Sequence, residues 1–299
     1  MKFIFSTDHH NSSINISCRK DFYPDTIYEK QRFIIQKGEE LGIDALLIGG
    51  DFFHNRRVSQ EYVNRLNLLY RAASFVVGCD IGNHDCLLGD PAQVMKCPLG
   101  GLLTSGVFIP EPGKWVYETE DSIVVFLPFM IDLPEYMELP KNDKTRILVA
   151  HAFYPGIYEA ENLPDFYFKN FDYVLLGHDH DAYPLQRNQR SIVVRPGGLA
   201  RGTRDKSNWR RKVRVFYVDT QYPETATFIE VPHKSAEEIF SKERILLEDR
   251  VKQSKVFDVL AKSVEATSDV DILALVDGFK LEPLVKERVV YWLREAALI

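Results

Sequence analysis

The chain has 299 residues, of which 45% are hydrophobic and 27% are charged, and its formal net charge is −6. This length and composition are ordinary for a globular protein and allow one large domain with room for a smaller one. No apolar run approaches the roughly 18 residues that a membrane span needs, so an integral membrane protein is excluded. The negative balance argues against a protein that coats polyanions nonspecifically, but it says little about a local patch.

The four cysteines indicate the redox environment. Cys18, Cys79, Cys86 and Cys97 show no CxxC spacing and no paired framework, which is typical of reduced thiols in a cytoplasmic protein. We also expect no cleaved secretory signal, because the first motif of the candidate site, described below, begins at Asp8.

The first part of the chain predicts strands that alternate with helices. Short apolar runs predict strands at residues 2–6, 44–48 and 75–79. Amphipathic patterns between them predict helices at residues 26–41 and 59–73. A strand–helix–strand order of this kind implies right-handed crossovers and a largely parallel sheet.

The middle of the chain is richer in strands. We expect them at residues 122–127, 146–149, 173–176, 191–195, 212–219 and 226–231. Two of these strands lead directly into histidine motifs. The sequence therefore predicts an α/β fold in which two sheets pack together, helices lie outside, and candidate ligands gather along one edge.

After Pro232 the composition changes to charged, periodic segments that predict helices at residues 235–267 and 283–297. We therefore expect a catalytic domain over residues 1–232 and a small helical region, either capping or partner-binding, over residues 233–299. The last helix carries an apolar stripe of Leu284, Val285, Val289, Trp292, Leu293 and Ala296. Such a stripe packs either on its own domain or on a partner, and the sequence leaves both interpretations open.

Seven of the eight histidines lie in or beside five short motifs, and a strand-like run precedes each motif. The motifs are Asp8-His9-His10, Gly50-Asp51-Phe52-Phe53-His54, Gly82-Asn83-His84-Asp85, Ala150-His151 and Gly177-His178-Asp179-His180. Histidine and carboxylate side chains bind borderline divalent metals and move protons near neutral pH. Open α/β sheets place their active sites at the ends of strands. The pattern therefore predicts a two-metal hydrolase.

The ligand types favour particular metals. Aspartate, asparagine and histidine without a thiolate favour manganese, iron or zinc over a calcium cage. Asp51 is central in the order of the motifs, and its carboxylate could bridge two cations. Two cations about 4 Å apart lower the pKa of a water that they share and neutralise both oxygens of an in-line phosphoryl displacement.

Two histidines need separate interpretations. His84 is the natural proton donor for the leaving oxygen, because Asp85 beside it could keep the imidazole oriented and charged. His9 would alternate away from the site on an extended segment, so we do not expect it to be a ligand. Each motif alone is weak, since Asn and Asp are common in turns, and the order of all five makes the prediction specific.

These motifs resemble those of the calcineurin-like metallophosphoesterase superfamily, which run D-x-H, G-D, G-N-H-D/E, H and G-H-x-H. All five are intact and in order between residues 8 and 180. The resemblance implies a four-layer α/β/β/α sandwich and a catalytic role for His84. It also implies two metal sites that share one carboxylate, with Asp8, His10, Asp51 and His180 at one ion and Asp51, Asn83, His151 and His178 at the other.

A finer resemblance concerns the double-strand-break repair nucleases of the SbcD type. In that branch, the histidine three residues after the aspartate of the Gly-Asp motif, here His54, helps to position the phosphate. Residues 195–201 are similar to the G-S-x-x-R element of the branch. Two departures are Gly198 in place of a serine and Asn11-Ser12 in place of the usual Leu-Gly. Together with a short C-terminal region, these departures suit a compact, phage-type member.

A basic stretch follows the last motif. Residues 187–214 contain ten lysines or arginines and one acid, a local charge of +9 in a chain whose remainder sums to −15. We expect part of this stretch to contact DNA, and the candidate residues are Arg201, Arg204, Arg210, Arg211 and Lys212. The alternative is a solvated loop and strand edge whose cations deter aggregation. Arg56 and Arg57, just after His54, could extend the same surface.

The leading hypothesis is a manganese-dependent DNA nuclease, either an exonuclease or an endonuclease, that acts in repair, recombination or replication. Magnesium, iron and zinc are alternative cofactors. The main alternative function is a small-molecule phosphodiesterase or a protein phosphatase, and a scaffold that keeps the metals for structure is a third. By resemblance, we expect an SbcC-like ATPase of the SMC type as a partner, a homodimer and a cytoplasmic location.

Overall fold

The computed structural model describes residues 1–110, 115–131, 143–156, 163–202 and 206–246, together with Lys286 and Val290. The chain divides into two compact units, one of Met1–Ile16 and Asp21–Ala236 and one of Ser17–Lys20 and Glu237–Ile299. The predicted domain boundary at residue 232 stays a prediction. The apolar stripe of the last helix lies outside the described residues, and of the first C-terminal helix only α6 (Ala236–Ile239) and the residues up to 246 are described.

Five strands form the first sheet, in the order β11-β10-β1-β2-β3. They are β1 (Lys2–Ser6), β2 (Ala45–Ile48), β3 (Val76–Cys79), β10 (Arg214–Asp219) and β11 (Tyr222–Glu230). The first three run parallel and are joined by the crossover helices α1 (Tyr23–Leu41) and α2 (Gln60–Arg71). β10 and β11 form a hairpin, and β10 pairs antiparallel with β1. The predicted strand–helix–strand order is therefore present.

Six strands form the second sheet, in the order β4-β5-β6-β7-β9-β8. They are β4 (Val116–Glu118), β5 (Ser122–Leu127), β6 (Thr145–His151), β7 (Tyr173–Gly177), β8 (Gln186–Asn188) and β9 (Ser191–Val194). The four inner strands are parallel, whereas the two short edge strands are antiparallel to their neighbours. Helix α4 (Asp165–Asn170) connects β6 to β7 in the chain.

The sequence patterns do not predict the short helical turns that follow β3 and β9. These are η1 (Asn83–Asp85), η2 (Leu87–Gly89), η3 (Pro91–Lys96), α3 (Pro98–Thr104) and α5 (Lys206–Arg210). Each is too short for a 3.6-residue periodicity to show in the sequence. Local capping starts some of them, since Asp90 accepts a hydrogen bond of 3.0 Å from the amide of Ala92 at the beginning of η3.

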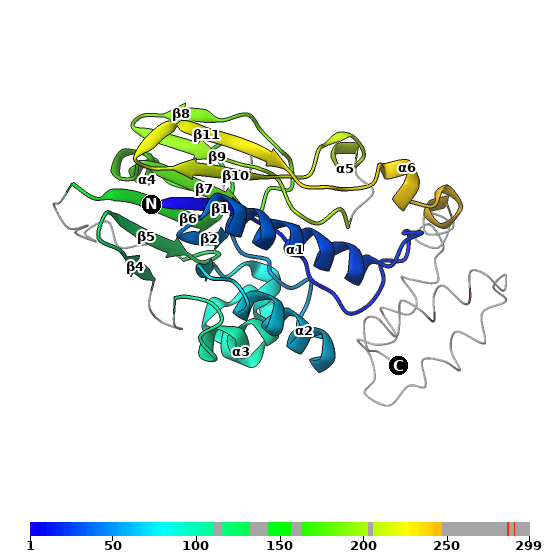
Figure 1. The fold of residues 1–299 in the computed structure, drawn as a ribbon. Coiled ribbons are helices and arrows are strands. Elements are labelled where there is room, and N and C mark those ends of the chain that lie inside the picture. The colour runs from blue at the N-terminus through cyan, green and yellow to red at the C-terminus, as the bar shows by residue number, and fades with distance from the viewer. Residues whose placement is uncertain are drawn as a thin grey trace. The chain divides into compact units, whose positions relative to one another are not determined.

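Three hydrophobic cores separate four layers of structure (Figure 1). Alternate residues of β1 face different cores, because successive side chains of a strand point to opposite faces. Representative members are Ile4, Ile34 and Leu66 between the first sheet and helices α1 and α2, Phe3, Phe126 and Phe216 between the sheets, and Phe168 and Val174 between the second sheet and α4. The predicted α/β fold, with two sheets flanked by helices, is therefore confirmed.

Helix α1 begins three residues earlier than the pattern predicts. Pro24 in its first turn supplies a helical φ and needs no hydrogen-bond partner for an amide, so the helix starts at Tyr23. It ends at Leu41 as predicted, because Gly42 adopts a left-handed conformation (φ 58°) and its amide donates to the carbonyl oxygen of Glu39. Although α1 has 19 residues, no helix in the described part of the chain combines the length and the hydrophobicity that crossing a bilayer requires.

Helix α2 offers a matched test of the first core. Leu66 is fully buried, whereas Leu68 in the same helix is 71% exposed. We expect Leu66→Ala to lower the free energy of unfolding by about 2–5 kcal/mol, because it leaves a cavity between α2 and the first sheet. Leu68→Ala should change it by less than about 0.5 kcal/mol. Urea denaturation followed by circular dichroism measures both values, and equal losses would contradict this position of the core.

Candidate active site

The motif residues converge because they follow the carboxyl ends of neighbouring strands. Four motifs come after β1, β2, β3 and β7, and His151 is the last residue of β6. In open α/β sheets, such strand ends form the ligand-binding edge, and here both sheets contribute to it. Hydrogen bonds join the loops, since the amides of Asp8 and His10 donate to the carbonyl oxygens of Gly50 (3.2 Å) and Asp51 (2.9 Å).

The first group of candidate ligands contains Asp8, His10 and His180, whose ligand atoms lie within 4.8 Å of one another. The Nε2 atoms of His10 and His180 are 2.9 Å apart. His180 Nε2 also lies 3.6 Å from Asp8 Oδ1. The structure thus brings together three of the residues that the resemblance implies for one metal.

The second group contains Asp51, His151 and His178, again with ligand atoms within 4.8 Å of one another. Asn83 belongs beside them, because its Oδ1 atom lies 3.2 Å from His151 Nε2. Asp51 faces both groups, with Oδ2 at 3.6 Å from His10 Nε2 and Oδ1 at 3.5 Å from His151 Nε2. This geometry suits a carboxylate that bridges two cations.

The buried groups of the site fit divalent cations. Asp8 and Asp51 are 0% and 2% exposed, and among the described residues no lysine or arginine forms an ion pair with either. The facing nitrogens of His10 and His180 need a proton or a cation between them, since a neutral imidazole nitrogen without hydrogen is an acceptor. The buried Nδ1 of His10 has no hydrogen-bond partner in the described part of the chain. Carboxylate and imidazole together are ligand types of manganese, iron and zinc.

Burial favours the neutral form of His10 and His151, which is the form of histidine that binds a metal. Burial lowers the pKa of His151 to about 4, although Asp8 opposes the shift. Burial, and then repulsion from His180, lower the pKa of His10 well below its usual range. His151 Nδ1 donates to the carbonyl oxygen of Gly49 (2.7 Å), which leaves the lone pair of Nε2, 3.5 Å from Asp51 Oδ1, available to a cation.

Four of the candidate ligands have a left-handed backbone. Asp8, His10, Asp51 and His178 have φ values of 51°, 46°, 48° and 80°. This conformation costs a residue other than glycine roughly 1–3 kcal/mol and persists only where the surroundings hold it. The hydrogen bond between Asp8 and His178 is one interaction that holds these residues. The backbone amide of His178 lies 3.2 Å from both carboxylate oxygens of Asp8. Strained residues that cluster in one place are typical of functional sites.

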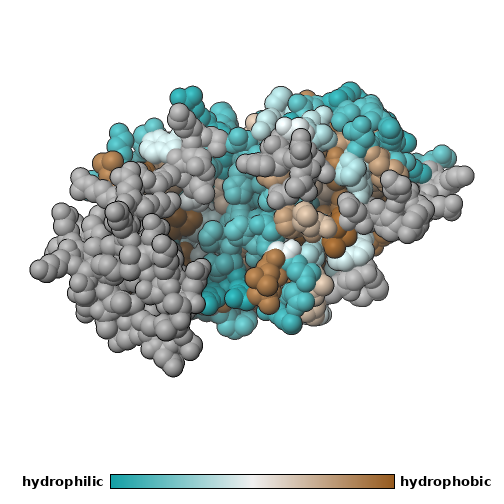
Figure 2. Space-filling view, turned by 180° about the vertical axis from the view of Figure 1, so that it is seen from behind, coloured by the Kyte–Doolittle hydropathy of each residue, from teal (hydrophilic) through white to brown (hydrophobic). Residues whose placement is uncertain are grey.

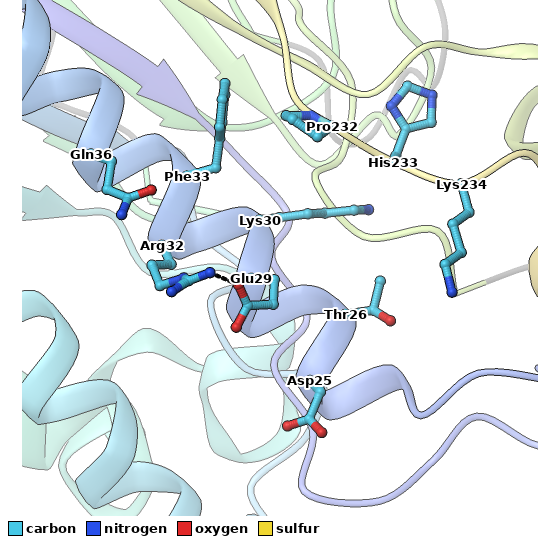
Figure 3. Close-up of a pocket in the computed structure, with 10 residues that line it drawn as sticks. All are labelled: Asp25, Thr26, Glu29, Lys30, Arg32, Phe33, Gln36, Pro232, His233 and Lys234. Carbon is cyan, nitrogen blue, oxygen red and sulfur yellow. Dashed lines mark ion pairs between the residues drawn. The ribbon is translucent and has the colours of Figure 1, made fainter.

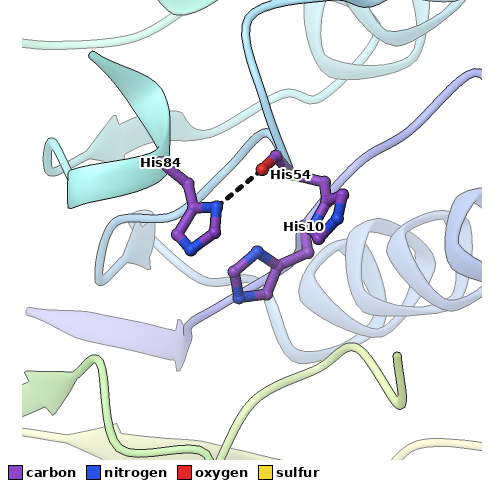
Figure 4. A group of neighbouring side chains, drawn as sticks. All are labelled: His10, His54 and His84. Atoms are coloured by element: carbon purple, nitrogen blue, oxygen red, sulfur yellow. Dashed lines mark hydrogen bonds between the residues drawn. The ribbon is translucent and has the colours of Figure 1, made fainter. Parts of the chain in front are cut away.

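His10, His54 and His84 form a cluster of three rings at the exposed side of the site (Figure 4). The rings of His54 and His84 are stacked, with centroids 5.6 Å apart and planes 19° apart. His84 Nδ1 lies 2.6 Å from the carbonyl oxygen of His54 and therefore donates to it. His84 Nε2 remains as the atom that can exchange a proton with a substrate.

Asp85 has a different role from the predicted one. Its buried carboxylate accepts hydrogen bonds from the backbone amides of Phe52 (3.1 Å), Phe53 (2.8 Å) and Gly82 (3.0 Å). The prediction that Asp85 orients the His84 ring is therefore wrong, because the His54 carbonyl does so. Asp85 instead joins the loop after β2 to the loop after β3.

Two glycines allow these loops to approach closely. A Cβ atom at Gly177 would lie 2.0 Å from the carbonyl oxygen of Gly49. A Cβ atom at Gly82 would lie 2.1 Å from Asp51 Oδ1 and 2.3 Å from the amide nitrogen of Asp51. Both positions exclude any side chain, because the neighbouring atoms belong to the backbone or to a candidate ligand.

A buried hydrogen-bond network that the sequence patterns do not predict lies behind the first motif. His9 points into it, away from the candidate ligands as expected, with Nε2 at 2.8 Å from Ser6 Oγ and Nδ1 at 3.1 Å from Gln31 Oε1. Gln31 accepts from the Tyr70 hydroxyl (2.7 Å) and donates to Asn11 Oδ1 (2.8 Å). The asparagine that replaces the usual leucine thus completes a polar core. The one signal in the sequence is a glutamine on the buried face of a helix.

In the described part of the basic stretch, Arg195 and Arg201 are buried and contribute no surface charge. Arg201 is 2% exposed, and its guanidinium donates to the carbonyl oxygens of Asn208 and Lys234. The guanidinium of Arg211 donates to two carbonyl oxygens within residues 198–200. The guanidinium donors of Arg201 and Arg211 are thus bonded to backbone carbonyl oxygens, and DNA binding by these two residues stays a prediction.

The other candidate DNA-binding residues differ from one another. Arg204 lies outside the described residues. Lys212 is exposed, but its ammonium pairs with Glu230 at 2.7 Å. Arg210 is exposed and belongs to no ion pair within the described ranges. Of the four candidates that the structure describes, Arg210 alone is therefore free to meet a phosphate.

A pocket of about 530 Å³ lies beside α1 and the segment 232–234, and Figure 3 shows its lining. Lys30 is buried there and donates to the carbonyl oxygen of Leu199 at 2.8 Å. Glu29 and Arg32 on the same helix form an ion pair of 2.6 Å. None of the five motifs contributes to this pocket, so we do not place the candidate active site in it.

The fold and the site together define a class of protein, the metal-dependent phosphoester hydrolases with aspartate and histidine ligands at the strand ends of two packed sheets. The family model described as calcineurin-like phosphoesterase matches residues 1–182. The chain belongs to this family, as its motifs predict.

Several solved structures are similar to this chain. An archaeal phosphodiesterase is 15% identical over 77% of this chain and 99% of that chain, with a TM-score of 0.43. A dimetal phosphatase from Danio rerio is 11% identical over 78% of this chain and 99% of that chain, with a TM-score of 0.48. The phosphoesterase Yfce from E. coli is 16% identical over 78% of this chain and 100% of that chain, with a TM-score of 0.39. No curated protein sequence matches the chain.

Substitution of Gly82 tests the position of Asp51. We expect Gly82→Ala to lower the metal-dependent hydrolysis of bis-p-nitrophenyl phosphate about 100-fold or more, because the new methyl group displaces the bridging carboxylate. Gly101→Ala is the matched control, since a Cβ atom in that part of α3 would meet no atom within 4 Å. The control should keep its activity and its melting temperature. A Gly82→Ala enzyme with near wild-type rates would show that Asp51 is not held as described.

Substitution of Gln31 tests the buried network. Gln31→Leu removes partners of His9, Asn11 and Tyr70, and each unsatisfied buried group costs roughly 1–3 kcal/mol. We expect the free energy of unfolding to fall by about 2–5 kcal/mol in urea denaturation. Gln36→Leu, at an exposed position of the same helix, should change it by less than about 0.5 kcal/mol. Similar values for the two variants would contradict the role of the network.

Proposed function

We propose that the protein is a manganese-dependent nuclease of the SbcD-like branch, which hydrolyses phosphodiester bonds of DNA as an exonuclease or an endonuclease. The observation that carries the proposal is the loop after Asp51. This loop presents His54, Arg56 and Arg57 as exposed residues, and the His54 ring stacks on His84. A substrate phosphate at the ligands would therefore have cations close by for the neighbouring phosphates of a strand.

The residues of the chain have distinct tasks in this reaction. Bound divalent cations would supply Lewis acidity and neutralise charge on the phosphate. His84 Nε2 gives its proton to the leaving sugar oxygen, because Nδ1 is occupied by the His54 carbonyl. His54 steadies the phosphate under attack from beside His84, and Arg56 and Arg57 bind phosphates further along the strand.

The metal and the partners belong to the same proposal. A mixed set of imidazole, amide and carboxylate ligands suits manganese, iron or zinc, whereas magnesium prefers oxygen and keeps several waters. We expect manganese to support the reaction best. An SbcC-like ATPase of the SMC type, a homodimer and a cytoplasmic location are expectations that rest on the resemblance alone.

A small-molecule phosphodiesterase or a protein phosphatase is the alternative. The observation in its favour is that Arg201 and Arg211 are bonded to the backbone and unavailable to a polyanion. A structural scaffold is less well supported, because the exposed ring of His84 adds nothing to packing. A direct comparison of substrates separates these functions.

The first test compares substrates. End-labelled linear duplex and single-stranded DNA are incubated with manganese, in parallel with bis-p-nitrophenyl phosphate. We expect manganese-dependent shortening of DNA that falls by about 100-fold or more in His84→Ala, because the proton donor is lost. His233→Ala, a histidine outside the motifs, serves as the control and should retain the rate. Hydrolysis of the ester by an enzyme that leaves all DNA intact would favour the alternative.

The second test measures whether the arginines of the loop after Asp51 contact phosphates of the DNA. Each phosphate contact on duplex DNA contributes about −0.9 to the slope of log affinity against log salt concentration. We expect the Arg56→Ala, Arg57→Ala double variant to reduce the slope of log kcat/KM by about 2, while Arg32→Ala, on α1, leaves it unchanged. If the slope is the same in the double variant and in the wild type, Arg56 and Arg57 do not contact phosphates, and the nuclease proposal loses its main support.

A further inference from the structure

Two exposed apolar residues near the site have a strained backbone. Leu88 is 95% exposed and Met130 is 63% exposed, with φ values of 58° and 56°. A left-handed conformation is unusual for bulky residues, and the surrounding structure must hold it in place. Neither side chain is buried, so packing in a core does not account for either residue. Strained positions of this kind are found at ligand-binding sites.

The loops that carry Leu88 and Met130 meet beside the candidate active site. A Cβ atom at Gly89, next to Leu88, would lie 3.8 Å from the ring of Phe129, next to Met130. The amide of Phe129 donates to the carbonyl oxygen of Ile81 at 3.0 Å, directly before the third motif. The loops that carry the two exposed residues are therefore in contact beside the ligands from that motif.

Two phenylalanine rings lie beside His178 of the second ligand group. The ring centroid of Phe129 lies 5.2 Å from that of His178, and the ring centroid of Phe153 lies 4.3 Å from it. Both phenylalanines are half-buried. Phe129 and Phe153 therefore form an apolar wall at the second ligand group, and Met130 follows Phe129 in the chain.

The surroundings of the first ligand group have the opposite character. His54 lies next to His10, with ring centroids 5.6 Å apart, and the exposed Arg56 and Arg57 follow it in the chain. Figure 2 shows that hydrophobic side chains, in brown, also stand among hydrophilic ones, in teal, on one face of the molecule. A single strand of nucleic acid combines charged phosphates with apolar base faces, and proteins bind it with cations and stacking surfaces together.

We propose that Leu88 and Met130 form an apolar rim that packs against a nucleobase next to the bond that is cleaved. The proposal rests on the nuclease function proposed above and specifies its substrate, a DNA strand whose bases are unstacked at the cleavage site. A paired base inside a duplex stays stacked between its neighbours and does not reach the rim. Single strands and frayed ends are therefore the preferred substrates.

Digestion through a tract of abasic sites tests the rim. The substrate is an end-labelled single-stranded oligonucleotide with a short internal tract of abasic nucleotides. The control is an oligonucleotide of the same length that has a base at every position. Burial of a leucine or methionine side chain against a base contributes on the order of tenfold or more to binding. We expect the wild-type enzyme with manganese to slow about tenfold at the tract, which appears as a band on a gel for either direction of digestion.

Glycine at both positions removes the rim without unfolding the protein. The Leu88→Gly, Met130→Gly double variant loses the side chains and also relieves the backbone, since glycine adopts a positive φ freely. We expect its pause at the abasic tract to fall below about twofold, while its melting temperature rises by about 2 °C. The Leu88→Met, Met130→Leu variant keeps the apolar surface and should keep the pause. Leu68→Ser, which changes an exposed leucine of α2, serves as the control and should also keep it.

The outcomes separate the two proposals. A wild-type enzyme that passes the abasic tract without slowing, or a glycine variant that still pauses, would overturn the rim and leave the nuclease function intact. If neither oligonucleotide is cleaved in the presence of manganese, the nuclease function fails, and the rim fails with it.

Discussion

Asp51 lies between two groups of candidate ligands, and the rest of the site depends on its position. One carboxylate oxygen lies 3.6 Å from His10 and the other 3.5 Å from His151. The backbone leaves no space around it, since even a methyl group at Gly82 would collide with the carboxylate. Any displacement of Asp51 would therefore change its distance to both groups at once. The amide of His84 also donates to Asp51 Oδ1 at 2.9 Å, which connects the candidate proton donor to the same carboxylate.

Tertiary hydrogen bonds hold this arrangement against its own strain. Left-handed residues and buried carboxylates both cost free energy, and the site contains several of each. Asp85 offsets part of this cost by joining the loops after β2 and β3 through three amides. Gln31 offsets another part by satisfying the polar groups behind the first motif. Hydrogen bonds within the fold thus support the ligand positions, as an efficient metal site requires.

The basic stretch shows that the charge counted along a sequence can differ from the charge at the surface of the folded protein. Ten cations lie within residues 187–214, yet Arg195, Arg201 and Arg211 are turned inward. Guanidinium groups have five donors in a fixed plane, so they satisfy backbone carbonyl oxygens that no shorter side chain reaches. Arg211 thereby holds residues 198–200, and Arg201 donates to the carbonyl oxygens of Asn208 and Lys234, whereas Arg195 donates to the side chain of Gln186. The short loop after Asp51 carries two further arginines, Arg56 and Arg57, which are exposed.

The sequence by itself determined the family, the longer strands with helices α1 and α2, and the residues that converge at the strand ends, but not the edge strands β4 and β8 or the short helix α4. Periodicity and short motifs are local properties, so the parallel strands and the histidines from His10 to His180 could be recognised without coordinates. The short turns after β3 could not, because capping and tertiary contact define them. Only the tertiary structure decided the roles of Asp85 and Arg201 and the exposure of Leu88. The same carboxylate, guanidinium or apolar side chain can have different roles. Its role in this protein depends on which groups the fold places next to it.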